Sequence, residues 1–235
     1  MRTQLKPFKK KAILDLLKDN GNCISGEDLN SGVDVYLRMT KPEMARNSAL
    51  VTMIIQDMLT TMLGRPDNTS GVINRNTLFM LDEFSQLRRI GSLSPNDPQV
   101  SLADALATLR SKSCTLQLCM QSISQIDKVY TSDVRKEIFD TCEFFQVYSV
   151  QDPETRKYFA DLIGQKDVLN VSSTSSDSKN ASASKSTSRS REYIMAPEQF
   201  GRLAENNKVA LYYNGRYSIA DKVQYFTADP KLVKK

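Results

Sequence analysis

The sequence predicts an α/β fold with a mainly parallel sheet and flanking helices. Three observations support this prediction. Apolar runs typical of strands alternate along the chain with segments whose apolar residues recur at helical spacing. The connections between these segments are short, as in strands joined by crossover helices. Residues 76–81 form one continuous apolar run, which is typical of a strand buried on both faces of a parallel sheet.

In the first half of the chain we expect two helices and two strands. Residues 9–19 place their apolar side chains at helical spacing, and the same spacing recurs in residues 42–63, which Gly64 follows. Residues 33–39 alternate polar and apolar residues, as a strand does. The second strand is the apolar run at residues 76–81.

The second half of the chain continues this alternation. Further helices are expected at residues 100–110, 132–141, 153–163 and 196–200, and further strands at residues 115–120, 143–150, 209–214 and 216–226. Asn214-Gly215 fits the turn of a hairpin between the last two strands. Residues 171–191 are close to half serine with interspersed Lys and Arg, so we expect a flexible, solvated loop there.

The composition is that of an ordinary soluble protein, and it excludes several kinds of site. Of the 235 residues, 40% are hydrophobic and 25% are charged. The chain has no histidine, which excludes histidine-based triads and histidine-ligated zinc. Its four cysteines lack metal-ligand spacing and are expected to be free thiols. The net charge of +5 is compatible with nucleic-acid binding. No apolar run reaches the ~18 residues of a membrane helix, so the chain by itself is expected to be cytosolic.

Two adjacent carboxylates, Asp82 and Glu83, end the apolar run at residues 76–81. The carboxyl edge of a parallel sheet is where such folds bind ligands. In phosphoryl-transfer sites an aspartate at this position holds Mg²⁺ and a neighbouring carboxylate polarises the attacking water. An acidic strand exit into a solvated loop is the plainer alternative, because short acidic motifs are weak evidence.

Gln121 follows the second apolar strand, at residues 115–120, and strengthens the functional interpretation. A glutamine at such a strand end can bind a γ-phosphate or orient water. Arg110 ends the preceding helix, where it can act as an arginine finger toward a neighbouring subunit or serve as a favourable cation at a helix C-terminus. Arg88 and Arg89 are the competing candidates for the finger.

The phosphate-binding loop that such a site requires, GxxxxGK[ST], does not occur in the sequence. Without its lysine and its Ser/Thr metal ligand, the chain carries half of an ATP site. Basic residues are scattered and lack interleaved aromatics, so any nucleic-acid contact is expected to involve phosphates and to be indifferent to sequence.

Two linked motifs resemble those of the conjugative coupling proteins of type IV secretion systems, the TraG/TraD-like family. They are TLFMLDEFSQL at residues 77–87 and LCMQSISQI at residues 118–126. Downstream features are also similar, among them the serine-rich stretch and the MAPE sequence at residues 195–198. The resemblance covers about residues 32–226.

This resemblance implies a RecA-like P-loop ATPase that works as a homo-hexamer at the cytoplasmic face of the bacterial inner membrane. Its cofactors would be ATP and Mg²⁺. Its partners would be a single-stranded DNA–relaxase complex or effector proteins, together with components of the secretion channel. The resemblance further implies that Asp82 is the Walker B metal ligand, Glu83 the catalytic carboxylate, Gln121 the phosphate sensor and Arg110 the finger that acts in trans.

The family's membrane helices and Walker A segment are not in this sequence, so we expect it to cover the C-terminal part of such a motor and to be inactive alone. Residues 1–31 would be a remnant of an inserted helical domain, and residues 32–230 part of the ATPase domain. Two alternatives remain: a nucleotide-free interaction module or inactive relic, and an FtsK-like translocase of double-stranded DNA. An uncovered sheet edge would make the isolated chain aggregate or bind a partner.

Overall fold

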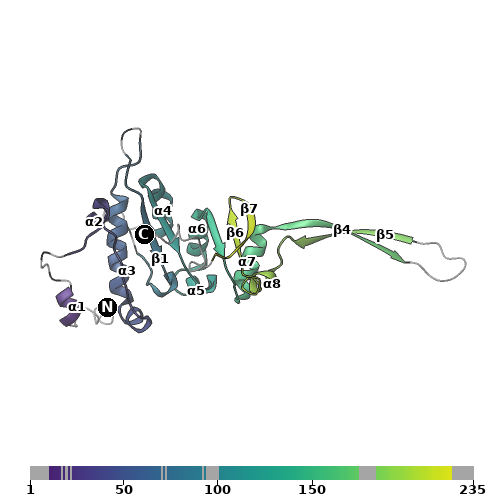
Figure 1. Cartoon of the computed structure of the whole chain (residues 1–235), viewed down its shortest axis with the longest axis horizontal. Coiled ribbons are helices and arrows are strands. Elements are labelled where there is room, and N and C mark those ends of the chain that lie inside the picture. Colours follow the sequence, from purple (N-terminus) through teal and green to yellow (C-terminus); the bar gives the residue numbers. More distant parts are fainter. Residues whose placement is uncertain are drawn as a thin grey trace, which may run out of the picture. The chain divides into compact units, whose positions relative to one another are not determined.

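The chain forms two compact units, residues 1–141 and residues 142–235. The structure is a computed structural model and describes residues 11–16, 18, 21, 23–69, 71, 73–91, 93, 101–174 and 184–223. No helix in these ranges has both the length and the apolarity needed to cross a membrane. Figure 1 labels helices and strands of both units where there is room.

Unit 1 contains helices around a pair of parallel strands. Its elements, in order, are α1 (Lys11–Leu16), α2 (Gly26–Ser31), α3 (Lys41–Leu63), β1 (Thr77–Leu81), the 3-10 turn η2 (Phe84–Gln86), α4 (Leu102–Leu109), the 3-10 turn η3 (Arg110–Lys112), β2 (Cys114–Leu118), α5 (Ile123–Asp127) and α6 (Ser132–Thr141). Strand β1 pairs in parallel with β2, from Thr77 opposite Cys114 to Leu81 opposite Leu118. Parallel pairing places both strand ends at the same edge.

The β1–β2 pair is buried on one face and open on the other. Phe79 and Leu81 of β1 are buried, whereas Leu78 and Met80, which point to the opposite face, are 56% and 59% exposed. The apolar run at residues 76–81 therefore does form a strand, but the expected burial on both faces is wrong for this chain. No described element covers the open face of β1.

Helix α3 spans the length of the strand pair and runs antiparallel to β1. Thr40 caps its start, because the Thr40 N–H and hydroxyl both donate to the Glu43 carboxylate, at 2.9 and 2.7 Å. Its far end is held by Arg65, whose guanidinium donates to the hydroxyl of Thr77 at the start of β1, at 3.1 Å. The first turn of α3 consequently lies at the carboxyl edge of the strands.

The strand expected at residues 33–39 is not present. These residues form neither helix nor strand, and Tyr36 within them is 86% exposed. An isolated alternating segment gains little by extending, because a strand is stabilised by ladder hydrogen bonds to a neighbour. No described strand pairs with this segment.

Unit 2 is built on an antiparallel sheet. Its elements are β3 (Phe144–Val147), α7 (Pro153–Ile163), β4 (Gln165–Thr174), β5 (Ser184–Tyr193), α8 (Pro197–Gly201), β6 (Lys208–Tyr213) and β7 (Arg216–Asp221). The strand order is β3-β6-β7. Asn214 and Gly215, with φ of 46° and 74°, form the turn between β6 and β7, as predicted from the Asn-Gly pair.

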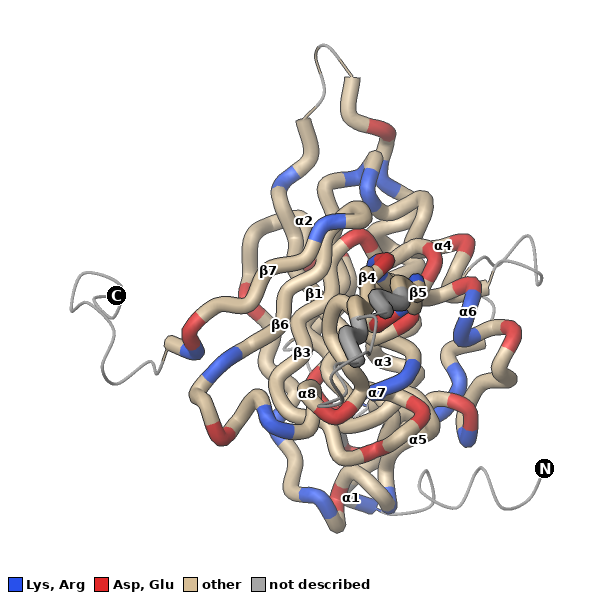
Figure 2. Tube along the Cα trace, turned by 90° about the vertical axis from the view of Figure 1, so that its right-hand side faces the viewer, with Lys and Arg blue, Asp and Glu red and all other residues tan. Residues whose placement is uncertain are grey.

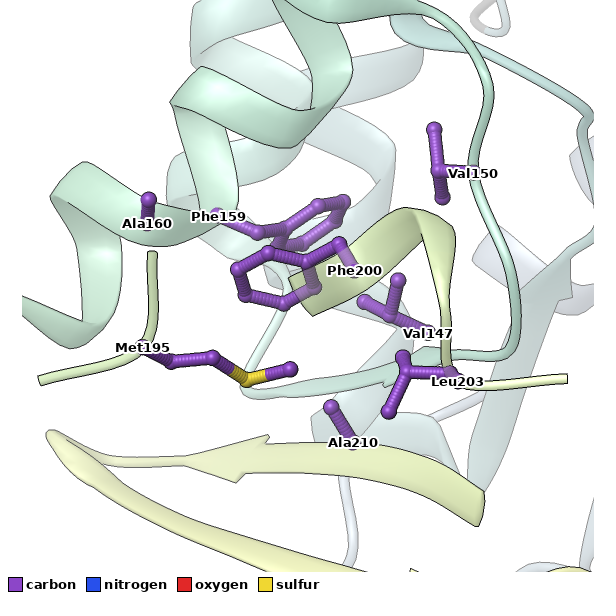
Figure 3. Close-up of a cluster of buried hydrophobic side chains, with 8 residues drawn as sticks. All are labelled: Val147, Val150, Phe159, Ala160, Met195, Phe200, Leu203 and Ala210. Carbon is purple, nitrogen blue, oxygen red and sulfur yellow. The ribbon is translucent and has the colours of Figure 1, made fainter. Parts of the chain in front are cut away.

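The core of unit 2 lies between helices α7 and α8 and the sheet (Figure 3). Phe159 of α7 and Phe200 of α8 meet at its centre, with ring centroids 6.2 Å apart. Ala210 of β6 and Val147 of β3 close the cluster from the sheet, and Met195 fills the remaining side. This packing holds α7 and α8 against the sheet of β3 and β6.

The serine-rich segment is more ordered than expected. Strands β4 and β5 form an antiparallel ladder from Gln165 opposite Tyr193 to Thr174 opposite Ser184. The prediction of a flexible loop at residues 171–191 is therefore wrong for residues 171–174 and 184–191, which are strands, and residues 175–183 lie outside the described residues. The physical reason is the ladder itself, which pairs the backbone amides of both segments in regular register.

The predicted α/β class is confirmed, since both units combine helices with strands. Within the described residues, parallel pairing is confined to β1 and β2, and the other paired strands are antiparallel. The division after Thr141 does not coincide with the boundary expected at residues 31 and 32, since α2 packs on α3 within unit 1. That functional boundary stays a prediction.

Candidate active site

Asp82 and Glu83 leave β1 in a sharp turn at the carboxyl edge. Glu83 adopts a left-handed backbone conformation, with φ of 55°, which is unfavourable for residues other than glycine, asparagine and aspartate. Its carbonyl accepts the N–H of Gln86 at 2.7 Å, which starts η2. A strained backbone that the surrounding hydrogen bonds maintain is often found at functional sites.

The ends of the two strands are tied together by their backbones. The N–H of Cys119 donates to the carbonyl of Leu81 at 3.0 Å, and the N–H of Phe84 donates to the carbonyl of Cys119 at 2.9 Å. These bonds extend the parallel ladder beyond β1 and β2. They bring the segment that contains Gln121 next to Glu83, as the order of the strands led us to expect.

Four side chains at this edge are joined in a row. The Gln121 amide nitrogen donates to Glu83 Oε1 at 3.4 Å, and the Gln125 amide nitrogen donates to Gln121 Oε1 at 3.4 Å. The Ser85 hydroxyl then donates to Gln125 Oε1 at 3.0 Å. Sequence reasoning selected Glu83 and Gln121 but missed Ser85 and Gln125. Gln121 lies before α5 and Gln125 lies on it, so the signal for Gln125 was its place in the QSISQ run that follows β2.

Lys41 is a cation that the sequence did not suggest. It is the first residue of α3, and its Nζ lies 3.9 Å from Glu83 Oε1. The Lys41 side chain is 87% exposed, so the pair is worth little in stability. Its significance is electrostatic, since it places a positive charge beside the carboxylate and amide. No sequence pattern links residues that are 42 positions apart.

Asp82 offers an accessible oxygen ligand at the same edge. Its Oδ1 accepts the backbone N–H of Glu83 at 3.1 Å, and the side chain is exposed. Among the described residues, no group of three or more acidic, histidine or cysteine side chains could hold a metal ion. A Mg²⁺ ion here would therefore need water and phosphate oxygens as its other ligands, which is how Mg²⁺ is often bound at nucleotides. The donors present fit that mode.

Arg110 does not join this cluster. It follows α4 directly and begins η3, which leads into the amino end of β2. Strand β2 has five residues and thus spans about 13 Å, so Arg110 lies at the edge opposite the carboxylates. Arg88 is held elsewhere, because its backbone N–H donates to the hydroxyl of Thr52 on α3, at 3.0 Å.

Basic residues occur on many elements, with acidic residues among them (Figure 2). The sequence also lacks GxxxxGK[ST], so the chain does not itself contain the loop that binds nucleotide phosphates.

Comparisons of the fold point to one group of proteins. Solved structures of a bacterial conjugative coupling protein, TrwBdeltaN70 in its unbound form, match with a TM-score of 0.57 and 21% identity, covering 78% of this chain and 39% of that one. Plasmid coupling protein TrwB in complex with ADPNP matches with a TM-score of 0.64 and 19% identity, covering 86% and 44%. The complex of TrwB with ADP and Mg²⁺ matches with a TM-score of 0.55 and 21% identity, covering 76% and 37%.

These matches establish a shared RecA-like fold, and the chain spans about two fifths of the solved coupling protein. No curated protein gives a significant sequence match. A family model described as the TraM recognition site of TraD and TraG matches residues 76–205, which is more than half of the chain and includes Asp82, Glu83, Gln121 and Arg110. The chain belongs to this TraG/TraD family.

Proposed function

We propose that this chain is the C-terminal part of a coupling-protein ATPase that recruits DNA or effector proteins and drives them into a type IV secretion or conjugation channel. The observation that carries the proposal is the contact between Gln121 and Glu83 where two parallel strands end. Membership of the TraG/TraD family and the fold shared with TrwB support it.

Within this motor we assign each side chain a role from its chemistry and place. Asp82 would ligate Mg²⁺ on ATP, since its carboxylate is exposed at the strand end. Glu83 would polarise the attacking water, and Gln121 would sense the γ-phosphate while it contacts Glu83. The bound nucleotide and Mg²⁺ would supply the phosphoryl group and neutralise its charge. The phosphate-binding loop would come from residues outside this sequence.

Arg110 is proposed as the finger that acts on a neighbouring subunit. Its place at the edge opposite Asp82 and Glu83 separates it from the site of its own chain. An arginine so placed contributes to hydrolysis only when another subunit brings its carboxylates to it, as in a ring. A homo-hexamer at the cytoplasmic face of the inner membrane satisfies this requirement and is part of the proposal.

The test is the nucleotide hydrolysis of the complete motor, with this chain joined to or combined with the segment that supplies the phosphate-binding loop. Replacing Glu83→Gln is expected to lower kcat by about 100-fold or more, because a positioned general base contributes that much. Nucleotide binding should stay within about threefold, since the amide keeps the size of the side chain and its place at the edge.

The matched control is Glu137→Gln, which neutralises an exposed glutamate on α6 that is not part of the hydrogen-bonded row from Glu83 to Ser85. It is expected to leave both kcat and nucleotide binding unchanged. Turnover retained in Glu83→Gln would remove the role given to Glu83. A complete motor that hydrolyses no nucleotide would remove the ATPase proposal itself.

An interaction module without nucleotide chemistry is the second candidate, and the β4–β5 ribbon favours it. Leu169 and Val171 of β4 are 60% and 61% exposed although both are apolar. A two-stranded ribbon is marginally stable in water and gains stability from a partner. This candidate predicts that neutralising both Asp82 and Glu83 leaves partner binding unchanged, whereas Leu169→Ser weakens it in a pull-down with the secretion substrate.

A further inference from the structure

Gln121 is exposed, and an unsupported amide on its side chain could face Glu83 with either its nitrogen or its oxygen. Only the nitrogen can donate to the Glu83 carboxylate, which is acceptor-only when ionised. This requirement fixes the direction of every bond in the row. Gln121 must then accept from the Gln125 nitrogen, and Gln125 must accept from the Ser85 hydroxyl, as the structure shows.

Gln125 and Ser85 are themselves well anchored. Gln125 lies on α5 between Ile123 and Ile126, which are 2% and 0% exposed. Ser85 follows Phe84, which is 1% exposed and stacks on the Tyr130 ring with centroids 5.7 Å apart. Both side chains thus start from backbone that cannot shift without disturbing the core of unit 1.

We propose that Gln125 and Ser85 are positioning residues that hold the amide nitrogen of Gln121 toward Glu83. The inference deepens the proposed ATPase and rests on it. By fixing the amide in advance, the pair removes the orientational freedom that Gln121 would otherwise lose at each turnover. It also connects the Gln121 segment to η2, so that a movement of Gln121 on phosphate release is transmitted to the segment after Glu83.

The sharpest variant is Gln125→Glu. A carboxylate there still accepts from Ser85 and keeps the side-chain volume, but it can no longer donate to Gln121 Oε1. It competes with Glu83 for the Gln121 nitrogen and favours the reversed amide. In the complete motor, kcat is expected to fall about tenfold or more in Gln125→Glu, and about three- to tenfold in Gln125→Met and Ser85→Ala. The KM for ATP should stay within about twofold.

Matched controls separate positioning from folding. Ser149→Ala removes a half-buried hydroxyl that donates to the Gly201 carbonyl at 3.0 Å, and Gln146→Met removes an amide that donates to the Tyr148 hydroxyl at 2.7 Å. Both lie in unit 2 and should leave kcat unchanged. A purely structural role for Gln125 would lower the melting temperature and leave kcat per folded molecule unaltered, and that result would overturn the proposal.

A second measurement tests the proposal in this chain without any activity. The side-chain amide signal of Gln121 is followed by ¹H–¹⁵N NMR and identified by its loss in Gln121→Met. Replacing Glu83→Gln should move this signal in the wild-type background. In the Gln125→Met background the same replacement should move it less than half as far, because the amide no longer faces position 83.

The two measurements together distinguish the possible failures. An equal movement of the Gln121 signal in both backgrounds, or kcat within twofold of wild type in Gln125→Glu, would overturn the positioning role. If the complete wild-type motor hydrolyses no ATP, the proposed function fails, and the NMR comparison alone then decides whether Gln125 orients Gln121.

Discussion

Replacing Arg65→Met is expected to destabilise unit 1 by about 3–5 kcal/mol, because Arg65 is a buried cation whose guanidinium makes several hydrogen bonds within unit 1. Arg65 is 7% exposed and follows the end of α3. Its guanidinium donates to Asn30 Oδ1 at 2.7 Å, to the Arg75 carbonyl at 3.0 Å and to the Thr77 hydroxyl at 3.1 Å. Two weaker contacts reach the Lys112 carbonyl and Cys114 Sγ, both at 3.4 Å.

The magnitude follows from these contacts. A hydrogen bond to a charged group is worth about 1.5–3 kcal/mol, so three short bonds give an upper limit of roughly 5–9 kcal/mol. The net loss of stability is smaller than this limit, because methionine avoids the free-energy cost of burying a guanidinium. The remaining 3–5 kcal/mol is a large share of the roughly 5–15 kcal/mol that stabilises a typical protein.

The assay is urea unfolding monitored by hydrogen–deuterium exchange, which measures the unfolding of peptides from unit 1 and from unit 2 separately. The control is Arg46→Met, in which the lost guanidinium is exposed and donates to the Pro42 carbonyl of its own helix at 3.1 Å. That change should cost less than about 0.5 kcal/mol. A loss below about 1 kcal/mol for Arg65→Met, or an equal loss for both variants, would refute the reasoning.

Three further predictions concern other parts of the chain. Hydrogen bonds from Ser111 and Lys112 lower the pKa of Asp67 from its ordinary 3.8, so the stability that ionised Asp67 contributes is present above pH 3.8 and is lost as the pH falls through the lower folded pKa. The difference in urea midpoint between wild type and Asp67→Asn should therefore shrink below about pH 4. A difference that stays constant with pH would contradict this prediction. Gly215→Ala should cost about 1 kcal/mol, because its φ of +74° disfavours a side chain although the space is open, while Gly91→Ala should be near neutral. Iodoacetamide should label exposed Cys23 at least about tenfold faster than Cys114, since burial raises the pKa of the Cys114 thiol, and equal rates by mass spectrometry would count against the packing around β2.

The order of elements could be predicted from the sequence, because each signal is local. Pro42 and Gly64 mark the ends of α3, and the apolar run before Asp82 marks β1. The Asn214-Gly215 pair predicts the turn between β6 and β7. Such signals depend on the conformational preferences of a few neighbouring residues, which operate before any tertiary contact forms.

The sequence by itself also indicated that polar residues at the strand ends form the candidate site. Asp82, Glu83 and Gln121 were selected because polar side chains at the carboxyl ends of parallel strands meet at one edge. Their catalytic roles stay predictions, as does the role of Arg110. The position of Arg110 at the opposite edge also follows from the order of the sequence, because Arg110 comes before β2 and Gln121 comes after it.

Only the tertiary structure decided what surrounds these residues. The alternation at residues 33–39 could not reveal that no partner strand was available, and the serine-rich composition could not reveal the β4–β5 ladder. Lys41 reaches Glu83 because α3 runs antiparallel to β1, and Ser85 reaches Gln125 because two strand ends are bound together. Contacts between residues 40 and 42 positions apart depend on how the elements pack, and no local preference encodes that arrangement.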